Sequence, residues 1–247
     1  MSDTEPRLEE QALSQAAEIG ITTQLEAVEK INVDVRTDLF KMVQGKADSI
    51  SVTGEGLVVQ KDIRVQEMEV HASDVNIDLL SAIFGDVELN HPADATVRVL
   101  LTEADLNRTL NSEFVRSKMP PFELDVEDER VTLQTQQMEL QLRGSGKIVF
   151  SGDFLMQAGN ITEELSFTAS ARPRTEDQPI LLEGFYCTNG QGISIELAAA
   201  FMEKAKELMK LPYFVYEGSA FRVIKMDVQE GSLSLEIEAR VSQIPSL

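Results

Sequence analysis

Cysteine is almost absent from this chain of 247 residues, with Cys187 as its single example. One cysteine excludes an internal disulfide and a zinc cluster built on several thiolates, and it is typical of a reducing compartment. No stretch approaches the roughly 18 apolar residues that a membrane-spanning helix needs. The N-terminus lacks a basic region followed by an apolar run, so we expect no signal peptide and a cytoplasmic location.

Basic residues are also scarce, since 22 Lys and Arg face 42 Asp and Glu, for a formal charge of -20. Nucleic acid is therefore an unfavourable partner, because phosphate binding needs clustered Lys and Arg. An anionic membrane should repel this surface on average. A transient peripheral membrane contact would need a local apolar or basic patch. The alternative is that the charge only keeps the protein soluble.

Residues for catalysis and metal binding are few. The two histidines, His71 in an expected strand and His91 in an expected loop, lack metal-ligand spacing. Cys187 has no basic neighbour to lower its pKa, so we expect a buried, inert thiol. No nucleophile elbow or phosphate-binding loop is present. We therefore predict no catalytic residues, no metal site and no cofactor.

The apolar residues that are present follow two periods. Helical spacing predicts a helix over 7–31 with Leu13, Ala17, Ile21, Leu25 and Val28 on one face. It also predicts short helices at 37–45, closed by Gly45, and at 76–85, and a long one at 194–210. Alternation predicts strands at 31–36, 47–59, 62–75, 120–128, 130–144, 146–159, 161–173, 179–190, 218–230 and 232–241.

The alternation changes parity within three of these strands. In 130–144, Val131 and Leu133 are followed by Met138 and Leu140, and the segments 62–75 and 218–230 behave alike. A parity change moves the apolar face to the other side, which needs a bulge or a strong twist. The alternative is that some of these segments contain a hairpin turn. The pattern favours a long, curved antiparallel sheet and an α+β fold.

The stretch VRVLLTEADLNRTLNSEF, residues 97–114, places several polar residues after an apolar strand. We interpret Thr102 as a helix N-cap, with Glu103 and Asp105 in the first turn, where negative charge suits the helix dipole. Leu106, Leu110 and Phe114 step by four, so we expect them to form the buried face. A catalytic carboxylate pair is the alternative, but no nucleophile, histidine or metal partner accompanies it.

Three segments of the chain resemble the LmeA-like phospholipid-binding family of bacteria, and its cyanobacterial branch in particular. They are the INVDVR strand at 31–36, the GKADSISVTGEGL segment at 45–57 and the TEADLN junction at 102–107. The resemblance implies a TULIP-like fold, in which a long curved antiparallel sheet wraps around one or two long helices to enclose an apolar lipid tube. We expect a flexible N-terminus at 1–7 and one such domain at 8–247.

The same resemblance implies lipid contact for the apolar face of the late helix and for nearby strands. Leu197, Phe201, Ala205 and Leu208 share a helical face, and methionines flank it. Methionine adapts to irregular shapes and suits variable chains. The alternative is that these residues simply fill a core. The predicted lipid-binding residues are Leu197, Phe201, Met202, Met209, Phe154, Met156 and Met226.

Three functions remain open from the sequence. The first is a non-enzymatic module that holds a phospholipid or fatty acid, acting in lipid transfer or membrane maintenance. The second is an acidic scaffold that recruits a basic protein, whose identity the sequence does not indicate. The third is an enzyme with an unrecognised site. An apolar tunnel would favour the first, a solid interior the second, and convergent polar groups in a pocket the third.

Overall fold

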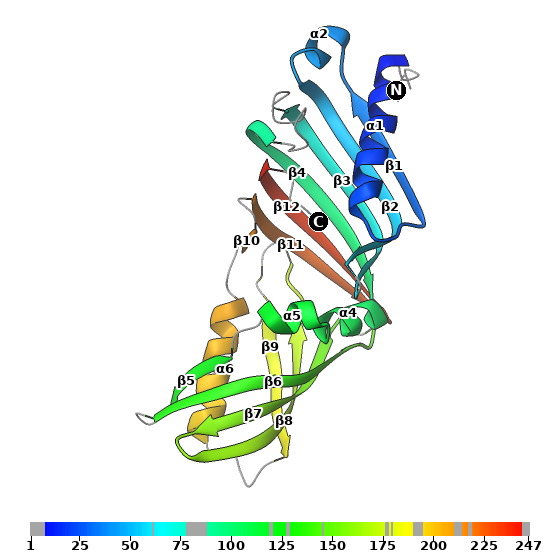
Figure 1. Ribbon diagram of the computed structural model, residues 1–247. Coiled ribbons are helices and arrows are strands. Elements are labelled where there is room, and N and C mark those ends of the chain that lie inside the picture. The colour runs from blue at the N-terminus through cyan, green and yellow to red at the C-terminus, as the bar shows by residue number, and fades with distance from the viewer. Residues whose placement is uncertain are drawn as a thin grey trace. The chain divides into compact units, whose positions relative to one another are not determined.

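The structure of the protein is a computed structural model (Figure 1). It describes residues 8–60, 62–77, 88–118, 121–126, 129–144, 146–175, 178, 180–189, 195–209, 214–216 and 219–243. The predicted flexible N-terminus and most of the predicted helix at 76–85 lie outside the described residues.

Backbone contacts group the chain into two compact units. Unit 1 consists of Met1–Leu101, Pro212–Ile224 and Ser234–Leu247, and unit 2 consists of Thr102–Leu211 and Lys225–Leu233. Each unit combines a sheet with helical elements. The single domain expected from 8 to 247 stays a prediction.

The seven-stranded sheet has the order β1-β2-β3-β4-β12-β11-β10. The pairs of β1 with β2, β2 with β3, β3 with β4 and β10 with β11 are antiparallel. The helices that accompany it are α1 (Leu8–Gln24) and α2 (Leu39–Met42). The strands are β1 (Lys30–Arg36), β2 (Lys46–Gln60), β3 (Ile63–Asn76), β4 (Glu88–Thr102), β10 (Phe214–Tyr216), β11 (Ser219–Gln229) and β12 (Ser232–Gln243).

Helix α1 packs along the β1 side of this sheet (Figure 1). Its residues Leu13, Ala17 and Ile21 contact a buried cluster that includes Val33 and Val52, which are opposite each other in the β1–β2 pairing. The predicted helical face is thus confirmed over these positions. The expected extension to Val28 is wrong, because the helix ends at Gln24 and the chain turns into β1.

Unit 2 is built around a five-stranded meander of order β5-β6-β7-β8-β9, in which each neighbouring pair is antiparallel. Helix α6 lies against this sheet (Figure 1). The helices are α4 (Glu103–Leu110), α5 (Glu113–Lys118) and α6 (Ile195–Met209), and the strands are β5 (Phe122–Val126), β6 (Glu129–Leu142), β7 (Ile148–Ala158), β8 (Ile161–Arg172) and β9 (Leu181–Asn189).

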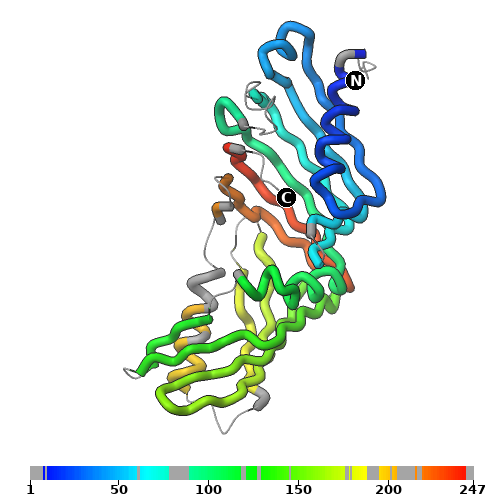
Figure 2. The backbone as a smooth tube through the Cα atoms, in the orientation of Figure 1, coloured from blue at the N-terminus to red at the C-terminus, as the bar shows by residue number. Residues whose placement is uncertain are grey.

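The predicted curvature is present, since the sheets curl in the smooth trace of Figure 2. In β6 the pairing with β7 shifts register between Thr135 and Gln137, which falls between the two apolar sets that the sequence distinguishes. In β3 no register shift accompanies the change between Val65 and Met68, and a strong twist there stays a prediction. The β2–β3 shift lies between Val58 and Gln60 near the end of β2. The expected change in β11 stays a prediction.

Two further expectations are corrected by the structure. Helix α4 ends at Leu110, and Phe114 belongs to the separate helix α5, where 38% of it is exposed. The spacing of four therefore did not continue as one buried face. His91 lies within β4 rather than in a loop, although Pro92 follows it.

Candidate functional site

The apolar interior of unit 2 comes from alternate residues on one face of its sheet. The β7–β8 pairing sets Phe154 opposite Leu165, and the β8–β9 pairing sets Phe167 opposite Cys187. Alternation places such residues on the same side, where α6 adds Leu197. The buried members of this core are Leu124, Val131, Leu133, Phe154, Leu165, Phe167, Ala169 and Leu197.

Phenylalanine rings form a row across the sheet. Phe122 meets Phe154 edge-on at 6.0 Å between centroids, and Phe154 stacks on Phe167 at 5.0 Å. Phe167 in turn stacks on Phe185 at 5.9 Å. Gly152 makes room for this row, because a Cβ atom there would lie 2.9 Å from the Phe167 ring. Strand residues thus supply a continuous aromatic floor.

An apolar cavity of about 20 Å³ lies between this floor and α6. That volume is close to the space of one water molecule, so the cavity as it stands does not hold an acyl chain. Carbon and sulfur side chains line it throughout. The lining residues are Leu133, Phe154, Leu165, Phe167, Phe185, Cys187, Leu197 and Ala198.

Cys187 connects the cavity with the surface. The residue is exposed, so the expectation of a buried thiol is wrong, yet its side chain lines the cavity. Position 187 lies in β9 at the end of the sheet order, which leaves one side of the residue open. Partial burial raises the pKa of the Cys187 thiol above its ordinary value, which keeps it protonated and weakly nucleophilic at neutral pH.

The predicted lipid-binding residues differ in where the structure places them. Leu197 and Phe154 line the cavity, and Met156 packs against the same core. Met202 is half-buried on α6. Phe201 and Met209 lie on α6, but their side chains are outside the described part. Met226 is half-buried in β11, and its backbone N–H donates to the Arg174 carbonyl at 2.9 Å.

Sequence reasoning missed several residues that line the cavity. They come mainly from β8 and β9, where Leu165 and Phe167 alternate in the run ELSFTASA. That alternation was visible and could have identified them. Their convergence with Ala198 depends on how α6 lies on the sheet, which no local pattern specifies.

The polar stretch after β4 has a structural role. Thr102 is the predicted N-cap, since its hydroxyl accepts from the Asp105 N–H at 3.1 Å. The same hydroxyl donates to Asp105 Oδ2 at 2.7 Å, and Arg108 Nη1 donates to Asp105 Oδ1 at 3.0 Å. Asp105 is 4% exposed. Its carboxylate is thus held by neighbours rather than presented to a substrate.

The other polar residues of α4 and its C-terminal end bind the backbone of β6. Leu142 N–H donates to Glu103 Oε2 at 2.6 Å. Asn107 and Asn111 each donate to one carbonyl and accept from one N–H of the strand. These bonds join Asn107 to Leu140 at 2.8 and 2.7 Å, and Asn111 to Met138 at 2.7 and 3.1 Å. Side chains four residues apart on the helix therefore form hydrogen bonds with the backbone of alternate residues of β6, as a neighbouring strand would.

Unit 1 contains a second hollow of about 460 Å³ on the face of its sheet. Its lining is mixed, because three alanines alternate with charged side chains that include Arg222, Arg240, Asp94 and Glu238. Arg222 Nη1 lies 3.8 Å from Glu238 Oε2. An acyl chain here would touch apolar surface but would also remove charged groups from water, so this hollow suits such a chain less well than the purely apolar lining in unit 2 does.

Metal chemistry and membrane spanning find no support in the described residues. No group of three or more His, Cys, Asp or Glu side chains there is arranged to hold a metal ion. None of the described helices has the length and apolar content needed to cross a bilayer.

A comparison with protein families identifies the chain. The family model described as LmeA-like phospholipid-binding matches residues 4–238. The chain belongs to the LmeA-like phospholipid-binding family. The match covers nearly all of the sequence, so the resemblance seen in its motifs is confirmed. No curated protein and no solved structure matched the chain.

Membership in the LmeA-like family bears on the two hollows. A phospholipid has apolar acyl chains, and unit 2 offers an apolar-lined cavity at the seam between α6 and the sheet. The hollow of unit 1 has charged side chains in its lining as well as apolar ones. A lipid partner is therefore supported for this LmeA-like protein.

Proposed function

We propose that the protein is a non-enzymatic lipid-binding protein that holds an acyl chain of a phospholipid or fatty acid between α6 and the sheet of unit 2. The observation that carries the proposal is the apolar cavity at this seam in a member of a phospholipid-binding family. The chain would lie on the phenylalanine row, as in a TULIP-like tube made by one helix and a curled sheet. Leu197, Phe201 and Met202 would contact it.

Lipid uptake requires α6 to move away from the sheet. The cavity of about 20 Å³ gives an acyl chain no room in the closed state. Among the described side chains of α6, Leu197 and Ala200 pack against the core and Ala198 lines the cavity, so the movement would break these contacts. A bound chain would replace those contacts with its own methylene groups.

The free energy of burying an acyl chain favours exchange of lipid with a membrane over permanent storage in the protein. Burying twelve methylenes from water stabilises a chain by roughly 10 kcal/mol, at about 0.8 kcal/mol each. The same chain is already out of water in a bilayer, so the protein gains little over the membrane. Such a protein suits lipid transfer between pools, or membrane maintenance, with transient contact at the membrane surface.

The test blocks the seam without removing the helix. Ala198 lines the cavity, and its neighbour Ala199 is exposed on the same helix, which makes Ala199→Trp a matched control for Ala198→Trp. We expect Ala198→Trp to weaken binding of a fluorescent fatty acid at least about tenfold, a change of about 1.4 kcal/mol. Ala199→Trp should bind as the wild type does.

The thermal stability of Ala198→Trp distinguishes two cases, one in which α6 can separate from the sheet and one in which the core between them is always filled. Overpacking a filled core costs about 1–3 kcal/mol, whereas a seam that opens should accept the ring at a smaller cost. Absence of binding by the wild type, together with a large loss of stability in Ala198→Trp, would contradict lipid binding. An acidic scaffold that binds a basic protein would then be the better account.

A further inference from the structure

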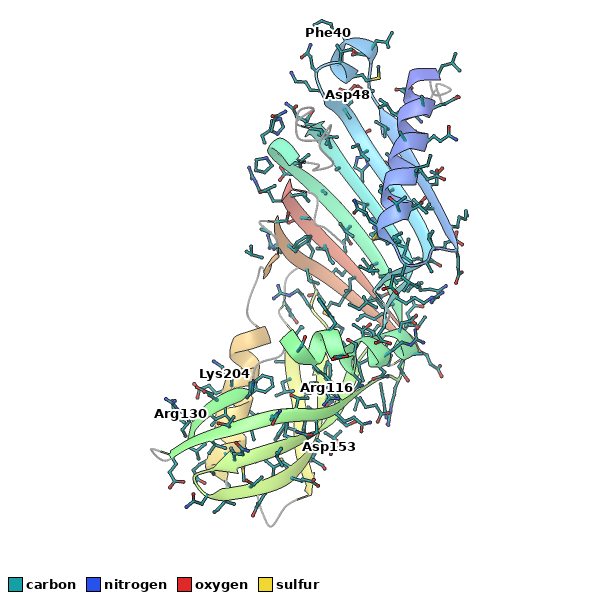
Figure 3. The ribbon with its side chains drawn as sticks, in the orientation of Figure 1. Phe40, Asp48, Arg116, Arg130, Asp153 and Lys204 are labelled. Atoms are coloured by element: carbon teal, nitrogen blue, oxygen red, sulfur yellow. The ribbon has the colours of Figure 1, made fainter. Side chains whose placement is uncertain are left out.

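The helical turn α2 displays apolar side chains that the fold does not use. In α2, Leu39 is 54% and Phe40 75% exposed, the C-cap residue Val43 is 67% exposed, and α2 contains no buried residue. Figure 3 labels Phe40 at this turn, which joins β1 to β2. Scattered exposed apolar residues are ordinary, but three on one turn without a packing role indicate an interaction surface.

The turn is held in place at its base. The Asp38 side chain caps it by accepting from the Lys41 N–H at 2.9 Å. The buried Thr37 donates its hydroxyl to the Lys46 carbonyl at 2.7 Å and its N–H to Glu10 Oε1 at 3.1 Å. These bonds fix the turn, so its apolar side chains are presented on an ordered support.

The local charge differs from that of the whole chain. Between Thr37 and Asp48 the charged residues are Asp38, Lys41, Lys46 and Asp48, so two lysines and two aspartates give a net charge of 0 against -20 overall. Lys41 Nζ forms an ion pair with Asp48 within this segment. The turn is therefore locally neutral and meets less repulsion at an anionic lipid surface than the whole acidic chain would.

We propose that α2 is a membrane-contact turn that inserts Leu39, Phe40 and Val43 into the headgroup region of a phospholipid bilayer. One helical turn is far smaller than the roughly 800 Å² per partner of a stable protein interface. Shallow insertion of about 5–10 Å by a few apolar side chains matches its size. The contact is weak and reversible, and it does not depend on where an acyl chain is held.

The natural absence of tryptophan allows a direct test in the full chain, because Phe40→Trp introduces a single tryptophan. Its emission should shift to shorter wavelength when phosphatidylcholine vesicles are added. Phe40→Asp should lower the fraction that sediments with the vesicles about tenfold, since it exchanges an inserted apolar ring for a charge. Both variants should keep the wild-type melting temperature, because Phe40 is 75% exposed.

Ile161→Asp is the matched control, as it makes the same kind of change at a residue that is 57% exposed in β8. It should sediment like the wild type. The proposal is overturned if vesicles leave the tryptophan emission of the Phe40→Trp variant unchanged, or if Phe40→Asp sediments as fully as Ile161→Asp. An emission shift that grows with protein concentration without vesicles would also overturn it, in favour of a second copy. Fatty-acid binding by Phe40→Asp should remain intact, which separates this test from that of the proposed function.

Discussion

At the residue scale, the polar side chains of the TEADLN stretch form hydrogen bonds with the backbone and with each other. Thr102 and Asp105 exchange two hydrogen bonds at the start of α4, and Arg108 adds a third to the buried carboxylate. Glu103 accepts from a strand N–H of β6. Each of these bonds uses a group that acid–base catalysis would need free. The stretch therefore fixes the junction between strand and helix.

We predict that Thr102→Ala lowers the free energy of unfolding by about 1 kcal/mol, because the Asp105 N–H loses its capping acceptor. Thr102→Ser keeps the hydroxyl and should recover most of the loss. Urea denaturation of the three proteins measures this. A stable Thr102→Ala variant that no longer binds fatty acid would contradict the structural role and point to a role in ligand binding.

Some residue-level expectations followed from local chemistry, and others needed the fold. The cap at Thr102 was predictable because its partners lie within three residues. The exposure of Cys187 and Phe114 was not, since it depends on which elements cover β9 and α5. The spacing of apolar residues indicates which side chains share a face. Whether that face is buried depends on which other helix or strand packs against it.

At the element scale, α4 takes the place of a strand beside β6. The register of β5 reaches only to Leu133, so the later residues of β6 lack that partner. Polar side chains four apart on a helix advance about 6 Å, close to the roughly 6.6 Å between alternate residues of a strand. The helix can therefore satisfy a strand edge that would otherwise pair with another chain.

We predict that Asn107→Ala destabilises the protein by about 1–3 kcal/mol, because it leaves both backbone groups of Leu140 without their side-chain partner. Arg116→Ala, an exposed change on the neighbouring α5, should stay within about 0.5 kcal/mol of the wild type. Chemical denaturation compares the two. Equal stability of both variants would show that the edge pairing contributes little.

The elements themselves were largely predictable from the sequence. Alternation identified most strands, and the parity change in β6 corresponds to a real register shift between Thr135 and Gln137. The parity change in β3 has no register shift beside it, since the β2–β3 shift lies between Val58 and Gln60 of β2. A single strand's sequence does not reveal where its partner deviates.

At the scale of the whole molecule, the sequence predicted the family and a curved antiparallel sheet. It did not predict the two compact units, because each is assembled from segments far apart in the chain. It likewise named Leu197 and Phe154 for the lipid site but not Phe167 or Phe185. Those positions become neighbours only when the five-stranded sheet and α6 pack together, and these contacts join residues that are far apart in the sequence.

The proposed function depends above all on a lipid chain that occupies the seam between α6 and the sheet of unit 2. Cys187 reports on this position directly, since it is the only cysteine of the chain and lines the cavity while remaining accessible. Its raised pKa means that reaction with a thiol reagent is slow near neutral pH and accelerates as pH rises through that pKa.

The decisive measurement is therefore the rate at which Cys187 reacts with a thiol reagent, followed at constant pH with and without fatty acid or phospholipid. Native mass spectrometry of the same samples gives the fraction of protein that carries lipid. We predict that the rate falls in proportion to that fraction, because the bound chain covers the thiol. A protein that carries lipid while Cys187 reacts at its original rate, or one that never carries lipid, would contradict the account.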